Sequence, residues 1–234
     1  MNDIIVKNDE YEELIKELSS RIILKNNFDI SDVKLVSGVD LAYYEISGKN
    51  YAVCSICTVD YKSKELIEEV HCYDEVNFPY IPGYLAFREL PLILKTFKLL
   101  KKDPNIVMFD GNGYLHFRNM GIATHASFYI NKPTIGIAKN YLKIENVDYM
   151  MPEDKAFAFT DIIIKDVVYG RCLRTHSHVK PIFISCGNYI DLDTVVTIVS
   201  NLINKESRLP IPVRLADLET KKLRRDILAC FEQR

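Results

Sequence analysis

The sequence lacks a membrane-crossing segment and a recognisable secretory leader. None of its apolar runs approaches the roughly 20 residues that a helix needs to cross a bilayer. The first residues, Met1-Asn2-Asp3, have neither the basic start nor the apolar stretch of a secretory signal. We therefore expect no membrane contact and a cytoplasmic location. With 48% apolar and 26% charged residues among 234, the composition is that of an ordinary globular protein.

A second cysteine pair is also missing, and this weakens the case for a zinc site. Cys54-x-x-Cys57 resembles half of a metal knuckle or a redox pair, but no other CxxC completes a four-cysteine site. The pair lies in the alternating stretch 51–61, which is typical of a strand, and residues three apart on a strand point to opposite faces. We therefore expect both to be core cysteines. The six cysteines as a whole are typical of a compartment where thiols stay reduced.

Net charge is nearly absent, and its distribution is more informative than its sum. A formal charge of −2 argues against a protein that coats nucleic acid without specificity. Residues 95–143 nevertheless carry eight Lys or Arg against two acids, whereas residues 65–75 are acidic. This pattern allows a basic face around a localised acidic centre. A solvated surface is the alternative interpretation of such runs.

Repeats, low-complexity tracts and linkers rich in Gly, Pro or Ser are absent, so one compact unit over residues 1–234 is the simplest organisation. Apolar residues recur at helical spacing over 10–24, which predicts an amphipathic N-terminal helix. Three strand-like runs follow, and the turn Ser47-Gly48-Lys49-Asn50 between the first two is typical of a hairpin. These runs, at 33–44, 51–61 and 66–73, predict three antiparallel strands.

The second part of the chain alternates strands with helices. Short continuous apolar runs end at Asp110 and at Lys139, which indicates strands that are buried on both faces. The spacing also predicts a helix over 87–102, with Pro91 tolerated near its first turn, and a helix after Gly121. A late hairpin is expected at 157–164 and 167–173, and two closing helices at 192–204 and 215–231. The predicted fold is α/β, a ribonuclease H-like mixed sheet flanked by helices.

Charged residues at strand ends provide the chemical signal. Asp40, Asp110 and Lys139 each follow a run of apolar residues, where strand ends open into a ligand crevice. Carboxylates gathered there are costly to bury without a partner, and their oxygens suit hard cations such as Mg²⁺ or Mn²⁺. Such an ion stabilises charge on a phosphodiester, which a nearby lysine also does. Taken singly, each aspartate is equally interpretable as a turn or cap residue, and the lysine as a solvated charge.

From Val36 to Leu223 the sequence resembles the endonuclease V family in an ordered series of blocks. The early blocks are Ser37-Gly-Val-Asp-Leu-Ala-Tyr43, Pro79-Tyr-Ile-Pro-Gly-Tyr-Leu-Ala-Phe-Arg-Glu-Leu-Pro91, Asp110-Gly-Asn-Gly113, Gly121-Ile-Ala-Thr-His125 and Pro133-Thr-Ile-Gly-Ile-Ala-Lys139. The later blocks are Leu173-Arg-Thr175, Val179-Lys-Pro181, Ile190-Asp-Leu192 and the segment from Leu209-Pro210 to Arg214-Leu-Ala-Asp217. Each block is a moderate signal, and their joint order is a strong one.

The resemblance implies a metal-dependent nuclease. Asp40, Glu89 and Asp110 match the family's metal carboxylates, with Mg²⁺ as the cofactor and Mn²⁺ as a substitute. Lys139 matches its catalytic lysine. Asp217 stands where relatives have Asp or His, so it either binds the metal or accepts a hydrogen bond from a metal-bound water. From position alone, Glu89 is only an acid near a helix start.

The resemblance also implies a base-inspecting loop and a pocket. Tyr80, Ile81, Pro82 and Gly83 resemble the family's wedge, in which two prolines stiffen a tip whose apolar side chains replace an extracted base. The other interpretation is a rigid surface loop with Tyr80 packed inward. In the family, the pocket for the flipped base is lined by segments that here contain Gly111, Gly113 and Gly121. His116 and Arg118 match positions in the family's loop, from which they would reach phosphates or the waters of the metal. Tight turns and a surface His–Arg pair are the alternative interpretation.

Three positions depart from the family pattern. Asn112 stands where His is frequent, so no imidazole role is assumed there, although an amide still donates and accepts hydrogen bonds. His176 stands where Arg is common, and Cys186-Gly187-Asn188 replaces a frequent Pro-Gly-His. Phosphate contacts from that later region are therefore expected to differ.

These observations predict hydrolysis of the second phosphodiester 3′ to deoxyinosine in DNA, a repair step. Cleavage of inosine-containing RNA is the nearest alternative, because contacts to a 2′-hydroxyl are not visible in the sequence. A non-catalytic nucleic-acid-binding module is the alternative from another class. The combination of Asp40, Glu89, Asp110 and Lys139 argues against it. We expect a monomer that binds nucleic acid and no membrane.

Overall fold

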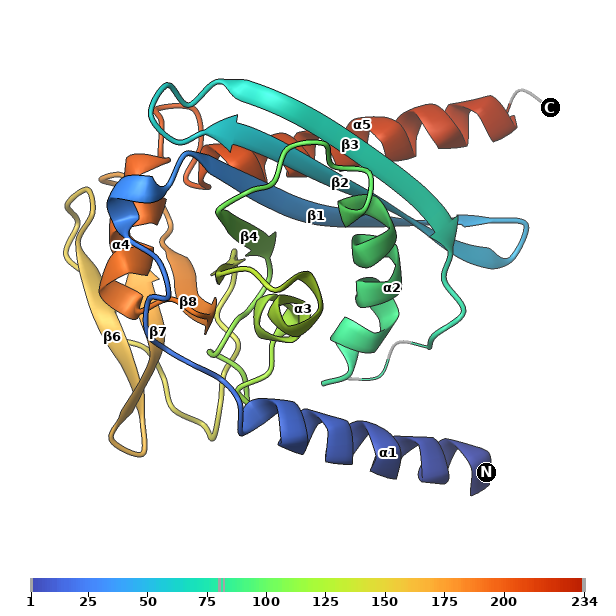
Figure 1. Ribbon diagram of the computed structural model, residues 1–234, viewed down its shortest axis with the longest axis horizontal. Helices are drawn as coiled ribbons and strands as arrows, with labels where there is room; N and C mark the ends of the chain where they lie inside the picture. Colours follow the sequence, from blue (N-terminus) through green and yellow to red (C-terminus); the bar gives the residue numbers. More distant parts are fainter. Residues whose placement is uncertain (1, 80, 82, 233–234) are drawn as a thin grey trace.

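The computed structural model describes residues 2–79, 81 and 83–232, which form one eight-stranded mixed sheet with helices on both faces (Figure 1). The strand order is β3-β2-β1-β4-β5-β8-β7-β6. The strands are β1 (Leu35–Ile46), β2 (Lys49–Asp60), β3 (Leu66–Glu75), β4 (Ile106–Asp110), β5 (Thr134–Ala138), β6 (Phe159–Ile164), β7 (Val167–Leu173) and β8 (Ile182–Asn188). The helices are α1 (Asn2–Ser19), α2 (Leu85–Phe97), α3 (Ile122–Ile130), α4 (Leu192–Asn201) and α5 (Ile211–Glu232), with a 3₁₀ turn at Ile30–Asp32.

The strand directions confirm the predicted ribonuclease H-like arrangement. β1, β2 and β3 are antiparallel, and β4 and β5 then run parallel to β1. The sequence interpretation gave no strand to residues 182–188, and this omission was wrong. β8 inserts between β5 and β7, antiparallel to both. All seven of its residues are buried, so it shows none of the alternation that marks a half-exposed strand.

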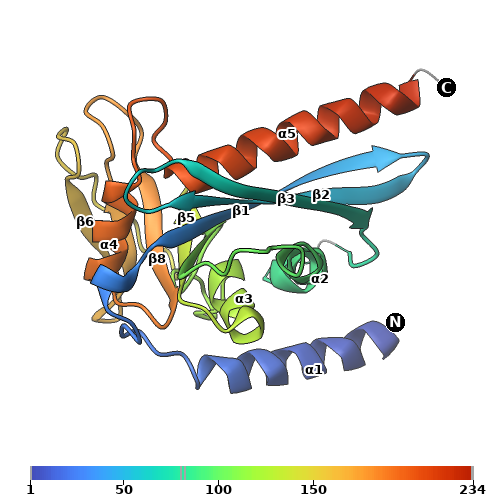
Figure 2. The ribbon, with the colours of Figure 1, turned by 45° about the horizontal axis from the view of Figure 1, so that its top comes forward.

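The helices form layers on the two faces of the sheet. α5 crosses one face of β1 and β2, while α2 and α3 cover the other, and α1 lies beyond them as an outer layer (Figure 2). Apolar clusters fill both interfaces. Cys54 packs on the α2 face, and Cys57 points to the opposite face. Both are free and buried, so the expected core role of these cysteines is confirmed.

Several helix boundaries differ from the prediction: α2 ends at Phe97 and not at residue 102, and α5 begins at Ile211 and not at residue 215. Two of the differences bear on the fold. The first helix ends at Ser19 and does not reach residue 24. Ile23 instead hydrogen-bonds through its backbone to the side chain of Asn188 and to Tyr189 (both near the end of β8), and these bonds replace those of a further helical turn. α2 begins at Leu85, so Pro91 lies inside the helix, beyond the first turn, and leaves the carbonyl of Phe87 without an amide donor.

One glycine sets how closely α5 approaches the sheet. A Cβ atom on Gly38 would lie 2.1 Å from the backbone carbon of Pro212, so only glycine permits this contact. The first turn of α5 therefore rests directly on β1, two residues before Asp40. None of the helices in the described part of the chain is long and apolar enough to pass through a bilayer.

Candidate active site

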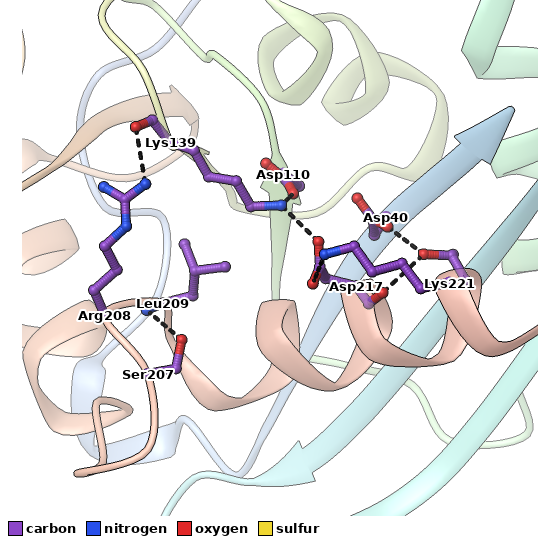
Figure 3. A network of polar contacts seen from close by, with 9 residues as sticks. Asp40, Asp110, Lys139, Ser207, Arg208, Leu209, Asp217 and Lys221 are labelled. Atoms are coloured by element: carbon purple, nitrogen blue, oxygen red, sulfur yellow. Dashed lines mark hydrogen bonds and ion pairs between the residues drawn. The ribbon is translucent and has the colours of Figure 1, made fainter. Parts of the chain in front are cut away.

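Three aspartates from separate elements converge beside the middle of the sheet (Figure 3). Asp40 lies on β1, Asp110 ends β4, and Asp217 lies on α5. One carboxylate oxygen from each is within 4.8 Å of those of the other two. Parallel pairing places Val39 beside Phe109, so the next residue on each strand is one of the two aspartates. The close contact at Gly38 brings α5, and with it Asp217, to the same point.

Lys139 directly follows β5 and binds two of these carboxylates. Its ammonium contacts Asp110 Oδ2 and lies 2.6 Å from Asp217 Oδ1. Burial alone would lower the pKa of Lys139, but the bonds to both aspartates outweigh this effect and raise it. Asp217 also accepts from Lys221 Nζ at 2.7 Å. Although burial opposes ionisation of Asp217, the two lysines lower its pKa, so this carboxylate is held charged.

Asp40 has no such cation. Among the described residues its hydrogen bond comes from the hydroxyl of Thr220, and no Lys or Arg forms an ion pair with it. Burial raises the pKa of Asp40 to about 7, against the hydrogen bond from Thr220, and the charges of Asp110 and Asp217 add to the rise. A bound cation would lower the pKa of Asp40 again, because it favours the charged carboxylate and offsets the cost of burying that charge.

Glu89 approaches from α2, on the other face of the sheet. The residue is only 8% exposed, and the hydroxyl of Tyr43 donates to its Oε1 at 2.9 Å. Burial raises the pKa of Glu89 to about 7, against the hydrogen bond from Tyr43 and with the charges of Asp40 and Asp110 contributing to the rise. Glu89 is therefore an electrostatic neighbour of the aspartates, although it lies outside the group whose oxygens meet within 4.8 Å.

The donor chemistry of this site fits a hard divalent cation. All candidate ligands are carboxylate oxygens, the type that Mg²⁺ and Mn²⁺ prefer. Asp40 and Glu89 are both buried without an ion-pair partner in the described part of the chain, and a cation would supply the missing charge. Asp40 and Asp110 are best placed to hold it, with Asp217 beside them.

Two supporting interactions were not anticipated from the sequence. Arg208 donates from Nη2 to the carbonyl of Lys139 at 3.2 Å (Figure 3). It also donates from Nη1 to the carbonyl of Pro181 at 2.6 Å, so it fixes the segment that carries Lys139. Thr220 and Lys221 lie three and four residues after Asp217. Because residues three and four apart lie on the same face of a helix, this spacing could have predicted that Thr220 and Lys221 lie beside Asp217.

A small cavity of about 90 Å³ lies at Gly111 and Asn112, the segment that directly follows Asp110. Four of the predicted base-binding residues line it, namely Gly83, Gly111, His116 and Gly121. The rest of the lining comes from Leu85, Ala86, Asn112, Met120 and Ile122. A Cβ on Gly121 would lie 2.2 Å from the carbonyl oxygen of Asn112, so glycine is required for this close approach. Gly113 is not part of the lining. It packs against β8, where a Cβ would meet the carbonyl of Cys186 at 2.2 Å.

The predicted wedge is only partly described. Tyr80 and Pro82 lie outside the described residues. Ile81 is half-buried against an apolar cluster that includes Ile15, Tyr84 and Met120. Two residues after Ile81, the carbonyl of Gly83 accepts from Arg118 Nη1 at 3.2 Å.

His116 and Arg118 have partners within the protein. Burial lowers the pKa of His116 to about 4, and the charge of Arg118 adds to this effect, so the imidazole is neutral near pH 7. The ring stacks on Phe117 with 4.2 Å between centroids. Arg118 pairs with Glu12 of α1. The structure thus places His116 in the cavity lining and ties Arg118 to the N-terminal helix.

The residues that depart from the family pattern take distinct roles. The Oδ1 atom of Asn112 is buried at the cavity without a hydrogen-bond partner in the described structure. His176 bridges Thr175 and the carbonyl of Asn204, and Asn188 caps the backbone of Ile23. The last two are therefore structural contacts, whereas Asn112 leaves an acceptor free.

Comparisons with known proteins agree over nearly the whole chain. The family model of Endonuclease V matches residues 16–218. Endonuclease V of Bacillus thuringiensis subsp. konkukian (strain 97-27) is 59% identical over 219 residues, which cover 94% of this chain and 93% of that protein. The crystal structure of endonuclease V from Bacillus subtilis superposes with a TM-score of 0.92 at 52% identity, covering 95% of this chain and 94% of that one.

A nucleic-acid complex is among the similar structures. Endonuclease V of Ciona intestinalis, solved with a 24mer DNA containing an inosine followed by a ribo-adenosine, has a TM-score of 0.84 at 28% identity and covers 94% of this chain and 99% of that one. The fold, the strand-end carboxylates and the match over residues 16–218 all point to the same family. The chain is a member of the endonuclease V family, and it is a nuclease.

Proposed function

We propose that this protein hydrolyses the second phosphodiester 3′ to deoxyinosine in DNA, with Mg²⁺ as its cofactor and Mn²⁺ as a substitute. The observation that carries the proposal is the convergence of Asp40, Asp110 and Asp217 beside a cavity with a free acceptor. The Ciona relative, solved on inosine-containing DNA, supports the choice of substrate. All these residues come from one chain, so a monomer, with residues 1–234 acting as one catalytic unit, is sufficient.

The protein side of the mechanism follows from the charges. Asp40 and Asp110 would hold the cation, and Glu89 would add a third carboxylate from the opposite face of the sheet. When bound, the cation supplies Lewis-acid stabilisation of charge that develops on the phosphodiester. Lys139 faces the same point and offsets charge on the phosphate, while Arg208 fixes the backbone that carries it. Lys139 and Lys221 keep Asp217 ionised and oriented.

Selectivity for the base follows from the cavity. Hypoxanthine carries an N1–H donor, whereas adenine presents an acceptor there and an exocyclic amine. The unpartnered Oδ1 of Asn112 would accept from the N1–H of hypoxanthine. The N1 atom of adenine is an acceptor, so it would face Oδ1 without a donor to pair with. Extraction of a mispaired base also costs less than extraction of a paired one. The proposed wedge consists of the four consecutive residues Tyr80, Ile81, Pro82 and Gly83.

Cleavage assays test the proposal directly. Asp110→Asn is expected to abolish cleavage of a deoxyinosine duplex in Mg²⁺, whereas Asp103→Asn, which alters an exposed acid paired with Lys132, is expected to leave it unchanged. Undiminished cleavage by Asp110→Asn would disprove the assigned centre. Matched DNA and RNA strands with one inosine decide the substrate. Faster cutting of RNA would overturn the choice of DNA and favour the ribonuclease alternative.

A further inference from the structure

A second group of metal-ligating side chains lies away from the active site. Glu69 and His71 lie on the edge strand β3, and Glu219 lies on α5. One ligand atom from each is within 4.8 Å of those of the other two. Antiparallel pairing aligns Asp40 with Ser55 and Ser55 with His71. The group therefore lies on the same face of the sheet as Asp40, two strands away, beneath the same helix.

The charges within this group are incompletely balanced. Lys222 Nζ pairs with both oxygens of Glu219, at 3.1 and 3.2 Å, but the lysine side chain is 56% exposed whereas that of Glu219 is 12% exposed. Within the described residues, Glu69 forms no ion pair. Its Oε2 instead faces the thiol of Cys57, a fully buried side chain whose Sγ lies 3.8 Å away. Two carboxylates thus meet beside a single, solvent-facing cation and a buried sulfur.

We propose that Glu69, His71 and Glu219 form a binding site for a divalent cation of the zinc class. Imidazole nitrogen combined with carboxylate oxygen suits Zn²⁺ and its neighbours in the first transition row, whereas Mg²⁺ prefers oxygen alone. The donor set thus differs from the all-carboxylate active site, and the two sites select different ions. This proposal does not depend on the substrate assigned above.

A cation at this site would fasten α5 to the edge of the sheet. The contacts that otherwise hold the outer part of α5 are apolar, between Leu223, Ile227 and the far ends of β1 and β2. Glu219 lies between Asp217, one of the three converging aspartates, and Thr220, whose hydroxyl donates to Asp40. Fixing Glu219 to β3 would therefore fix both of them. The expected role is to hold α5 in place, without participation in the chemical step.

Zn²⁺ titration by calorimetry tests the site without an activity readout. The full chain carrying Asp40→Asn and Asp217→Asn removes two of the three active-site aspartates from competition. This protein is expected to bind one Zn²⁺ and to melt at a higher temperature with it. Adding His71→Asn is expected to weaken binding by at least about 10-fold, because even the loss of an outer-shell partner usually costs that much and His71 is a direct ligand. Adding Lys222→Gln is expected to tighten binding, because it removes the competing ammonium.

A matched control separates the site from exposed histidines in general. His178 is also exposed, and its Nδ1 lies 2.5 Å from Asp154 Oδ2, yet no third ligand joins them in the described structure. His178→Asn in the same background is expected to leave Zn²⁺ affinity unchanged. Circular dichroism confirms that each variant is folded. Absence of Zn²⁺ binding in the parent variant, or equal weakening by His71→Asn and His178→Asn, would overturn the proposal.

Discussion

Asp40→Asn is expected to stabilise the metal-free protein, and to do so more at pH 8 than at pH 5. The pKa of Asp40 is raised to about 7 in the folded protein, mainly by burial, against an ordinary value of 3.8. An acid with a raised folded pKa contributes stability that is complete below the unfolded pKa and is lost as the pH rises through the folded one. The loss therefore runs from about pH 4 to about pH 7.

The magnitude follows from the width of that window. At about 1.4 kcal/mol per pH unit, the two units between pH 5 and pH 7 correspond to about 3 kcal/mol of unfolding free energy. Asparagine retains the shape of the neutral acid and does not titrate. The advantage of Asp40→Asn over wild type should therefore be about 3 kcal/mol larger at pH 8 than at pH 5. Titrating groups distant from Asp40 contribute equally to both proteins and cancel in this comparison. Glu89 does not cancel, because the charge of Asp40 helps to raise its pKa, so removal of that charge adds to the advantage of the variant at pH 8.

Urea unfolding in EDTA at the two pH values measures this difference. Asp103→Asn, an exposed control, is expected to show no pH-dependent difference from wild type. Saturating Mg²⁺ should raise the stability of wild type at pH 8 much more than that of Asp40→Asn, because the cation then replaces the missing charge. A stability difference that is the same at pH 5 and pH 8 would refute the argument that burial of this carboxyl destabilises the metal-free fold.

Three further variants test the site. Lys139→Met is expected to lower kcat by about 100-fold or more while Mg²⁺ affinity is retained, and an unchanged kcat would remove the lysine from the mechanism. Asn112→Leu should reduce the preference for deoxyinosine over adenine by about 10-fold or more, measured as a ratio of kcat/KM values, and a preserved ratio would leave recognition to the main chain. Gly121→Ala places a Cβ 2.2 Å from the carbonyl of Asn112, so cleavage of inosine duplexes should fall steeply while Mg²⁺ still binds. Full activity of this variant would show that the cavity is not the base pocket.

The sequence allowed the strands around the active site to be predicted because their apolar runs end at charged residues. Asp40 and Asp110 were found in this way, and parallel pairing of β1 and β4 places them side by side. Glu89 was indicated only by family resemblance, because a single acid on a helix has no distinguishing pattern. β8 was missed because a short strand that is buried on both faces lacks alternation. Ile23 was assigned to a helix for another reason: the helical spacing of apolar residues over 10–24 includes it, although its backbone pairs near the end of β8.

The strand-end charges and the ordered blocks that mark the family are visible in the linear sequence. Which of these charges are neutralised depends on the tertiary structure. Lys139 pairs with Asp110 and Asp217, whereas Asp40 and Glu89 remain buried without an ion-pair partner among the described residues. It also placed Glu69 and His71 beside Glu219, about 150 residues later in the chain. Such pairings depend on how a helix crosses a sheet, and no local pattern of residues records that geometry.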